Sequence, residues 1–204
     1  MRTRSKLALA GLAAALLLSM AVTNASARNL RVDEQGFRVT WTSLEFVNPG
    51  LGIRILCPVT LEGSFHSATI AKVIGSLIGY ITRAIVKNES CTGGNATVLT
   101  ATLPWHVTYE GFTGTLPSIT ALRVSRVRPA FRLRVSFFEC LSQPTNVNGT
   151  ITGTREAGGA FKAERLAPDA GQRFPCGTSF EGEFVGNGNV TRQGSTTRPL
   201  VTLI

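Results

Sequence analysis

Apolar and polar residues alternate along several runs of the chain. The apolar positions of the three clearest runs are Phe37, Val39 and Trp41, then Trp105, Val107 and Tyr109, then Phe131, Leu133, Val135 and Phe137. Successive side chains of a strand point to opposite sides, so this alternation is typical of a half-buried antiparallel strand. Turn-forming sequences separate the runs, among them Asn48-Pro49-Gly50 and Asn148-Gly149. Regular spacing of strands and turns predicts an all-β fold, an antiparallel β-sandwich or a distorted barrel.

One segment, residues 68–86, fits this pattern less well. Its polar residues recur at intervals that would form a stripe along a helix. Against a helix, Gly75 and Gly79 interrupt the segment and nine of its nineteen residues are β-branched. We therefore expect a strand over residues 76–87 and at most one short helix near residues 67–75.

A fourteen-residue pattern occurs twice, at Gly52–Phe65 and Gly171–Phe184, with six identical residues and no gap. The likeness extends upstream to residues 45 and 164, so the two copies span residues 45–65 and 164–184. The offset of 119 residues is far longer than a solenoid repeat and indicates two related halves. In both copies a glycine, Gly63 or Gly182, follows a glutamate, which suits a β-bulge or a close backbone approach.

The N-terminus has the order of a secretory signal peptide. Arg2, Arg4 and Lys6 precede an uncharged run rich in Leu and Ala, and Ala25-Ser26-Ala27 supplies small residues before a cleavage point. The apolar run is shorter than the ~20 residues of a membrane-spanning helix. We therefore expect residues 1–27 to be removed, leaving residues 28–204 as one secreted or cell-envelope-associated β-domain.

Four cysteines, an even number, lie within the expected mature chain: Cys57, Cys91, Cys140 and Cys176. In an exported protein this predicts two disulfides. The chain contains no CxxC pair, so the cysteines do not indicate a metal site. Three connectivities are open. The favoured one joins Cys57 to Cys91 and Cys140 to Cys176, which gives two loops of similar size and about 3–4 kcal/mol of stabilisation for each link.

Basic residues outnumber acidic ones, 21 to 12, for a net charge of +9. Three of them belong to the signal segment, which leaves +6. Five arginines cluster within twelve residues around the turn at residues 128–130: Arg123, Arg126, Arg128, Arg132 and Arg134. A hairpin carrying them would form a cationic ridge for an anionic envelope polymer, acidic lipid headgroups or an acidic protein. The alternative is a compositional preference for arginine on solvent-facing strands, and export makes nucleic acid an unexpected ligand.

Three glutamates are candidates for catalysis. Glu62 and Glu181 occupy matching positions in the two copies of the repeat, and Glu110 has similar neighbours. Two of them across a cleft could serve as the acid and base of a glycosidase. In the alternative, each carboxylate satisfies a nearby arginine such as Arg54 or Arg173 at the end of a strand.

The chain has two histidines, His66 and His106, which could act beside a serine such as Ser64, Ser67 or Ser179. No G-x-S-x-G motif supports a serine hydrolase, and no metal-binding or phosphate-loop motif predicts a metal ion or cofactor. We therefore expect a non-enzymatic structural or binding domain, with a small extracellular hydrolase as the alternative.

Three segments, residues 57–67, 76–84 and 102–117, resemble small secreted proteins of actinobacteria. Those proteins carry paired cysteines and a Pro-Trp dipeptide at the start of a strand, here Pro104-Trp105. The resemblance covers most of residues 40–185. It implies export, disulfides and an all-β fold, but it implies no activity and no catalytic or binding residue.

Overall fold

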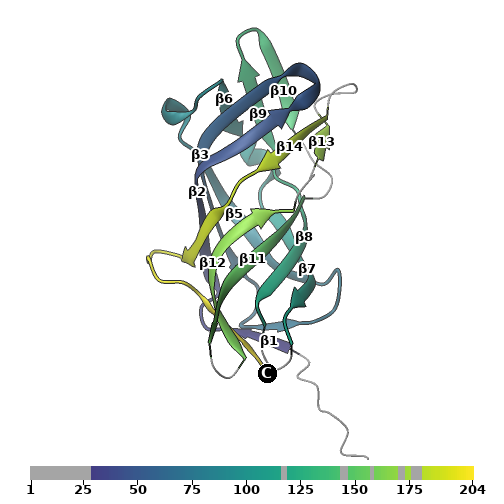
Figure 1. Cartoon of the computed structure of the whole chain (residues 1–204), viewed down its shortest axis with the longest axis vertical. Helices are drawn as coiled ribbons and strands as arrows, with labels where there is room; N and C mark the ends of the chain where they lie inside the picture. The colour runs from purple at the N-terminus through teal and green to yellow at the C-terminus, as the bar shows by residue number, and fades with distance from the viewer. Residues whose placement is uncertain (1–28, 116–118, 143–146, 157–158, 170–172, 176–180) are drawn as a thin grey trace, which may run out of the picture.

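Eight antiparallel strands close into a barrel, which forms the larger part of the molecule (Figure 1). The computed structural model describes residues 29–115, 119–142, 147–156, 159–169, 173–175 and 181–204. Each barrel strand pairs with the next, and the last one, β15, pairs back to the first, β2. In order around the barrel the strands are β2 (Gly36–Asn48), β3 (Ile53–Phe65), β5 (Leu77–Val86), β7 (Trp105–Thr113), β8 (Ala121–Val127), β11 (Val147–Glu156), β12 (Ala160–Pro168) and β15 (Gly188–Arg192).

The barrel interior is apolar because its strands turn their apolar residues inward. Val39 of β2, Leu61 of β3, Leu122 of β8 and Phe161 of β12 are all buried. Polar neighbours in the same strands, such as Arg38, are more exposed. The period-two pattern therefore matches the two faces of the barrel wall.

Bulges bend the barrel strands where glycine allows a close backbone approach. In β3 the register with β5 shifts between Glu62 and Gly63. A Cβ atom at Gly63 would lie 2.1 Å from the carbonyl oxygen of Tyr80, so only glycine fits without movement of the backbone. The predicted close approach after the glutamate is confirmed for this copy of the repeat.

The long strands β2 and β3 run past the barrel into a second region. A register shift between Trp41 and Leu44 separates the two parts of β2. Beyond it β2 pairs with β14 (Glu181–Val185), which pairs with β13 (Arg173–Pro175). A separate three-stranded sheet, here called the small sheet, consists of β6 (Asn95–Val98), β9 (Phe131–Val135) and β10 (Phe138–Ser142).

The small sheet packs on β2 and β14 through an aromatic cluster. The ring of Phe131 in β9 lies 5.2 Å from that of Phe46 in β2 and 5.8 Å from that of Phe184 in β14, measured between centroids. Trp105 at the start of β7 contacts Phe131 from the barrel side, at 5.7 Å. The two layers make a second core, here called the sandwich end, which lies at the upper end of Figure 1.

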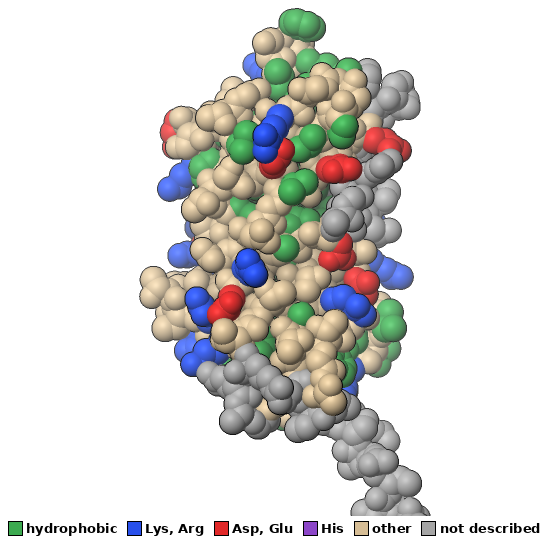
Figure 2. All heavy atoms as spheres, viewed as in Figure 1, with side chains coloured by type: hydrophobic (Ala, Val, Ile, Leu, Met, Phe, Trp, Pro, Cys, Tyr) green, Lys and Arg blue, Asp and Glu red, His purple; other side chains and the backbone are tan. Residues whose placement is uncertain are grey.

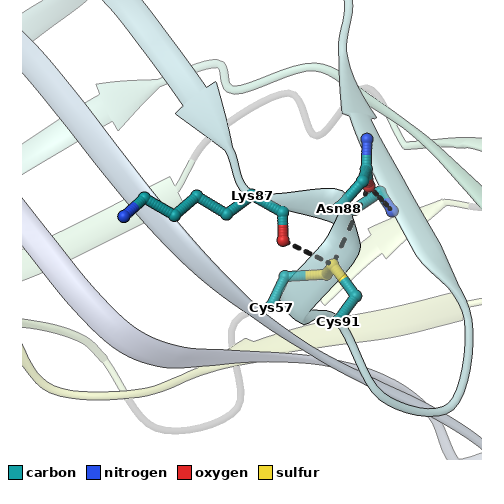
Figure 3. Close-up of a disulfide and its surroundings, with 5 residues drawn as sticks. Cys57, Lys87, Asn88 and Cys91 are labelled. Atoms are coloured by element: carbon teal, nitrogen blue, oxygen red, sulfur yellow. Dashed lines mark hydrogen bonds between the residues drawn. A yellow bond between two sulfur atoms is a disulfide. The ribbon is translucent and has the colours of Figure 1, made fainter.

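A disulfide joins Cys57 of β3 to Cys91, as predicted (Figure 3). Cys91 follows the 3₁₀ turn η2 (Asn88–Ser90) and precedes β6, so the bond ties the small sheet to the opposite layer. The side-chain oxygen of Asn88 accepts a hydrogen bond from the backbone N–H of Ala96 in β6, at 3.0 Å. Such a bond persists in an oxidising environment and fits an extracellular protein.

The second expected pair, Cys140 with Cys176, involves a residue outside the described ranges. Cys140 lies in β10 and is disulfide-bonded. Because Cys176 lies outside the described residues, that pairing stays a prediction. The same holds for the signal peptide of residues 1–27.

Three further strands extend the sheet beyond the barrel. They are β16 (Leu200–Leu203), which pairs with β12, β1 (Asn29–Val32), which pairs with β16, and β4 (Thr69–Ala71), which pairs with β1. Two other 3₁₀ turns are η1 (Pro49–Leu51) and η3 (Thr100–Thr102). Leu30, Val32, Ile70 and Val201 are buried, so these short strands complete the core at one end of the barrel.

The all-β expectation is confirmed, and the described residues contain no α-helix. The strand expected over residues 76–87 is β5, and the segment before it contains β4 rather than a helical turn. The expectation for Phe137 was wrong. Strand β9 ends at Val135, and Phe137 lies in the tight turn to β10 with its side chain fully exposed, 102%. Ser136 takes a positive φ of 50° to make that turn, which ends the alternation.

The two copies of the repeat have different surroundings. In the first copy, residues 53–65 form one long strand within the barrel and the sandwich end. In the second, β12, β13 and β14 divide the segment, and residues 170–172 and 176–180 lie outside the described residues. Glu45 pairs with Arg54 in the first copy, whereas its counterpart Glu164 pairs with Arg198. An ancestral relation between the halves stays a prediction.

Candidate functional site

The small sheet has one buried face and one face open to solvent. Phe131, Leu133 and Ala96 point into the sandwich core. The opposite face carries exposed side chains in two cross-strand rows, and we call it the arginine face. Its members are Asn95, Arg134 and Glu139 in one row and Thr97, Arg132 and Leu141 in the other.

Two arginines share one carboxylate on this face. Arg132 Nε lies 3.4 Å from one oxygen of Glu139, and Arg134 Nη2 lies 3.6 Å from the other. All three side chains are more than 40% exposed, so the pairing contributes little to stability. Two positive charges against one negative charge leave the cluster with a net charge of +1. Guanidinium N–H groups on the solvent side can donate to an anion.

The expected hairpin of five arginines does not form. Strand β8 carries Arg123 and Arg126, and β9 carries Arg132 and Arg134, but the two strands belong to different sheets and do not pair. The chain continues from the barrel into the small sheet, so these residues are spread along the molecule (Figure 1). Arg128 is exposed in the connection between the two strands.

Arg123 and Arg126 sit in the barrel wall. Arg123 is half-buried beside Gly111. Burial of Tyr109 raises the pKa of its hydroxyl, and the positive charge of Arg123 partly opposes this shift. Arg126 is exposed, takes a positive φ of 59°, and lies near Gly75. Of the five predicted residues, Arg132 and Arg134 are therefore the pair that shares a single exposed sheet face.

Glu62 is held by two arginines on the outside of the barrel. Arg38 on β2 approaches one carboxylate oxygen at 2.7 Å, and Arg83 on β5 approaches the other at 3.1 Å. The hydrogen bond from Arg38 is the main cause of a lowered pKa of Glu62, and Arg83 acts in the same direction against burial. An acid with a lowered pKa stays ionised at neutral pH, so Glu62 is a poor proton donor.

The three candidate glutamates lie far apart. Glu62 of β3 pairs with Arg83 of β5. Glu183 of β14 is level with Arg54, which lies eight residues before Glu62 in β3. Glu181 lies two residues before Glu183, so it is still farther from Glu62. At about 3.3 Å per residue, Glu62 and Glu181 are roughly 25 Å or more apart. Glu110 occupies a bulge toward the other end of the barrel. The two carboxyl groups of a glycosidase lie within about 10 Å, so Glu62 and Glu181 do not form that pair.

In the described part of the chain, no hydrogen bond joins a histidine side chain to Ser64 or Ser67. His106 packs edge-on against Tyr80, with 5.3 Å between ring centroids. Ser64 lies on the far side of Tyr80, two strands away from His106 and so about 9–10 Å distant. His66 is exposed at the end of β3, and Ser179 lies outside the described residues.

Acidic and basic side chains are interspersed on the face of the molecule seen in Figure 2, over β11, β12 and β14. Within the described ranges, no three His, Cys, Asp or Glu residues come together as a metal site would require. The same residues contain no helix long and apolar enough to cross a membrane.

Glu139 is the member of the arginine face that the sequence did not indicate. It lies five residues after Arg134, and only the register of the β9–β10 hairpin places it beside both arginines. Asn95 and Thr97 join the same face through pairing with β9, from a distance of more than thirty residues. Cross-strand neighbours of this kind are not visible in a single sequence.

No family model matches the chain, and no curated protein or solved structure is significantly similar to it. The resemblance to small secreted actinobacterial proteins therefore stays a prediction.

Proposed function

We propose that the chain is an exported, non-enzymatic binding domain of the extracellular space or cell envelope, and that it binds anionic polymer through the arginine face. One observation carries the proposal: Arg132 and Arg134 share a single carboxylate, Glu139, on an exposed sheet face. The remaining positive charge is held at a fixed position by strand pairing. An anionic polymer can bind to this positive charge, and such binding requires no catalytic group.

Neighbouring groups on the face suit such a ligand. Asn95 is opposite Arg134 and Thr97 is opposite Arg132, and both side chains are exposed. Their amide and hydroxyl groups can donate hydrogen bonds to oxygens of sulfate, phosphate or carboxylate groups. Binding of this kind is electrostatic and therefore weakens as salt screens the charges.

The test is retention on immobilised dextran sulfate, an anionic polysaccharide, measured as the NaCl concentration that elutes the protein. The double variant Arg132→Gln/Arg134→Gln is expected to elute at clearly lower salt than the parent. The matched control is Arg54→Gln/Arg198→Gln. It also removes two positive charges, but each of those arginines has its own glutamate, Glu45 or Glu164.

A third variant, Glu139→Gln, removes the negative charge of the arginine face and is expected to elute at higher salt than the parent. Equal shifts for the two double variants would show that net charge alone causes retention, which contradicts the proposal. Retention of the parent no stronger than that of Arg132→Gln/Arg134→Gln would contradict it as well. If the parent is retained on an immobilised acidic protein but not on dextran sulfate, the ligand of the arginine face is a protein, and the proposal of an anionic polymer is contradicted.

A further inference from the structure

The interior of the barrel contains an apolar cavity, which was not predicted from the sequence. Its volume is about 40 Å³. All eight barrel strands contribute to its wall, and every lining residue is apolar. Representative lining residues are Phe37, Leu61, Ile81, Val107, Ile151 and Val190.

Water is a poor occupant of this space. At roughly 10–15 Å³ for each water molecule the volume would hold about three, but a buried water needs two to four polar partners. The lining offers none, since all of its side chains are hydrocarbon. A small apolar group has no such requirement, and it would restore dispersion contacts that the lining atoms lack.

The cavity lies against the weakest ladder of the barrel. Strands β12 and β15 share two register pairs, Arg165 with Asn189 and Leu166 with Gly188, whereas β2 and β3 share eleven. Earlier in β12, at Ala160 to Lys162, the partner is β16 instead of β15. Leu166 of β12 and Val190 of β15 both line the cavity, so its wall includes this seam.

The loop between β15 and β16 covers the place where the partners change. The backbone N–H of Ala163 donates to the carbonyl oxygen of Pro199 at 2.9 Å, and both residues line the cavity. Few backbone hydrogen bonds would have to open here for a molecule to pass. The seam is therefore the natural route from solvent to the interior.

We propose that the barrel cavity is a binding site for a small hydrocarbon group, which enters at the seam between β12 and β15. The group is either a free apolar molecule or the end of an alkyl chain whose polar head stays in water. The site is independent of the arginine face, because its lining faces the inside of the barrel. It adds a second kind of ligand to the binding function.

The test uses cyclopentane for a free apolar molecule and hexanoate for an alkyl chain with a charged head. Methyl chemical shifts of the isotopically labelled protein are followed during each titration. We expect saturable shifts at the methyl groups of Ala163, Leu166 and Val190, with Ala96 and Ile55 of the sandwich end unchanged. Shifts with cyclopentane alone indicate a free molecule, and shifts with both indicate that a chain end also enters.

Ala163→Leu places three more carbon atoms in the cavity and is expected to weaken cyclopentane binding at least tenfold. The matched control, Thr191→Val, replaces a hydroxyl with a methyl group on the solvent side of β15 and should leave affinity within twofold of the parent. If Ala163→Leu does not fold, Val124→Ile adds a single methylene to the same lining and should weaken binding by a smaller factor.

Absence of saturable shifts with either probe would overturn the proposal. Equal binding by the parent and the cavity-filled variant would also overturn it, because the probe would then lie elsewhere. Shifts spread over the methyl groups of both cores would mean general partition into the protein, with the same consequence.

Discussion

The barrel and the sandwich end hold their strands together in different ways. In the barrel each strand has a partner on both sides, so backbone hydrogen bonds close the sheet on itself. In the sandwich end two layers of strands face each other, and a disulfide together with an aromatic cluster holds them in contact. The barrel is thus closed by strand pairing, whereas the two layers of the sandwich end are also linked covalently.

The same comparison separates the two proposed ligands. The barrel has an apolar space inside and paired charges such as Glu62 with its two arginines outside. The sandwich end has only a smaller cavity, about 10 Å³, and the outer face of its small sheet carries unbalanced charge. An apolar ligand therefore suits the barrel interior, and an anionic ligand suits the outside of the small sheet.

The largest expected effect comes from the aromatic cluster. Phe131→Ala removes the ring that touches Phe46, Phe184 and Trp105, and we expect it to lower the free energy of unfolding by about 3–5 kcal/mol. Urea denaturation measures the change. The exposed ring of Phe137 is the control, since Phe137→Ala should change the free energy by less than about 0.5 kcal/mol. Similar losses for the two variants would contradict the assignment of Phe131 to the core.

Removal of the disulfide should affect the sandwich end before the barrel. Cys57→Ser/Cys91→Ser opens a loop of sequence separation 34, and we expect a loss of about 3–4 kcal/mol. Hydrogen exchange should accelerate most for amides of β6 and β9, and least for amides of β7 and β8. Uniform acceleration across all of these strands would mean that the two regions have no separate local stability.

A smaller effect is expected at the bulge of β3. The Cβ atom added by Gly63→Ala meets the carbonyl oxygen of Tyr80, and we expect a loss of about 1–3 kcal/mol in thermal or urea denaturation. Gly50→Ala is the matched control, because its new Cβ atom would meet one side-chain oxygen at an ordinary 3.5 Å. If both variants match the parent in stability, the barrel wall is looser at this point than the structure indicates.

The smallest expected effect depends on pH. At neutral pH Glu62→Gln should lose about 1 kcal/mol, a modest value because Arg38 and Arg83 are partly exposed. The pKa of Glu62 is lower in the folded chain than the usual value of about 4.3, so its contribution is complete above that pH and falls as the solution becomes more acidic. The stability difference between parent and variant should therefore shrink steadily as the pH falls below about 4.3. A difference that grows toward low pH would have the wrong sign for this ion pair.

Much of the fold was predictable because strands leave a local mark in the sequence. The alternation at Phe37, Val39 and Trp41 and the choice of strand for β5 are confirmed, since each depends on neighbouring residues alone. The end of β9 was not predictable. A positive φ at Ser136 turns the chain and exposes Phe137, and the hydrophobic pattern continues through that turn without a break.

The candidate sites were harder to predict because they depend on register. Arg132 and Arg134 were correctly placed opposite Phe131 and Leu133, but the link to Glu139 arises only from pairing with β10. The expected partner of Glu62 was Arg54, eight residues back along the same strand, whereas Arg38 and Arg83 on adjacent strands bind it. The apolar cavity left no mark in the sequence, since its wall needs residues from all eight strands at once.

The unbroken course of β2 and β3 has a consequence for attempts to divide the molecule. Each strand gives one half to the barrel and the other half to the sandwich end. A fragment cut between Trp41 and Leu44 would leave both products with unsatisfied backbone groups along a core edge. The protein should therefore resist dissection into autonomous pieces, and limited proteolysis should yield either the intact chain or small peptides.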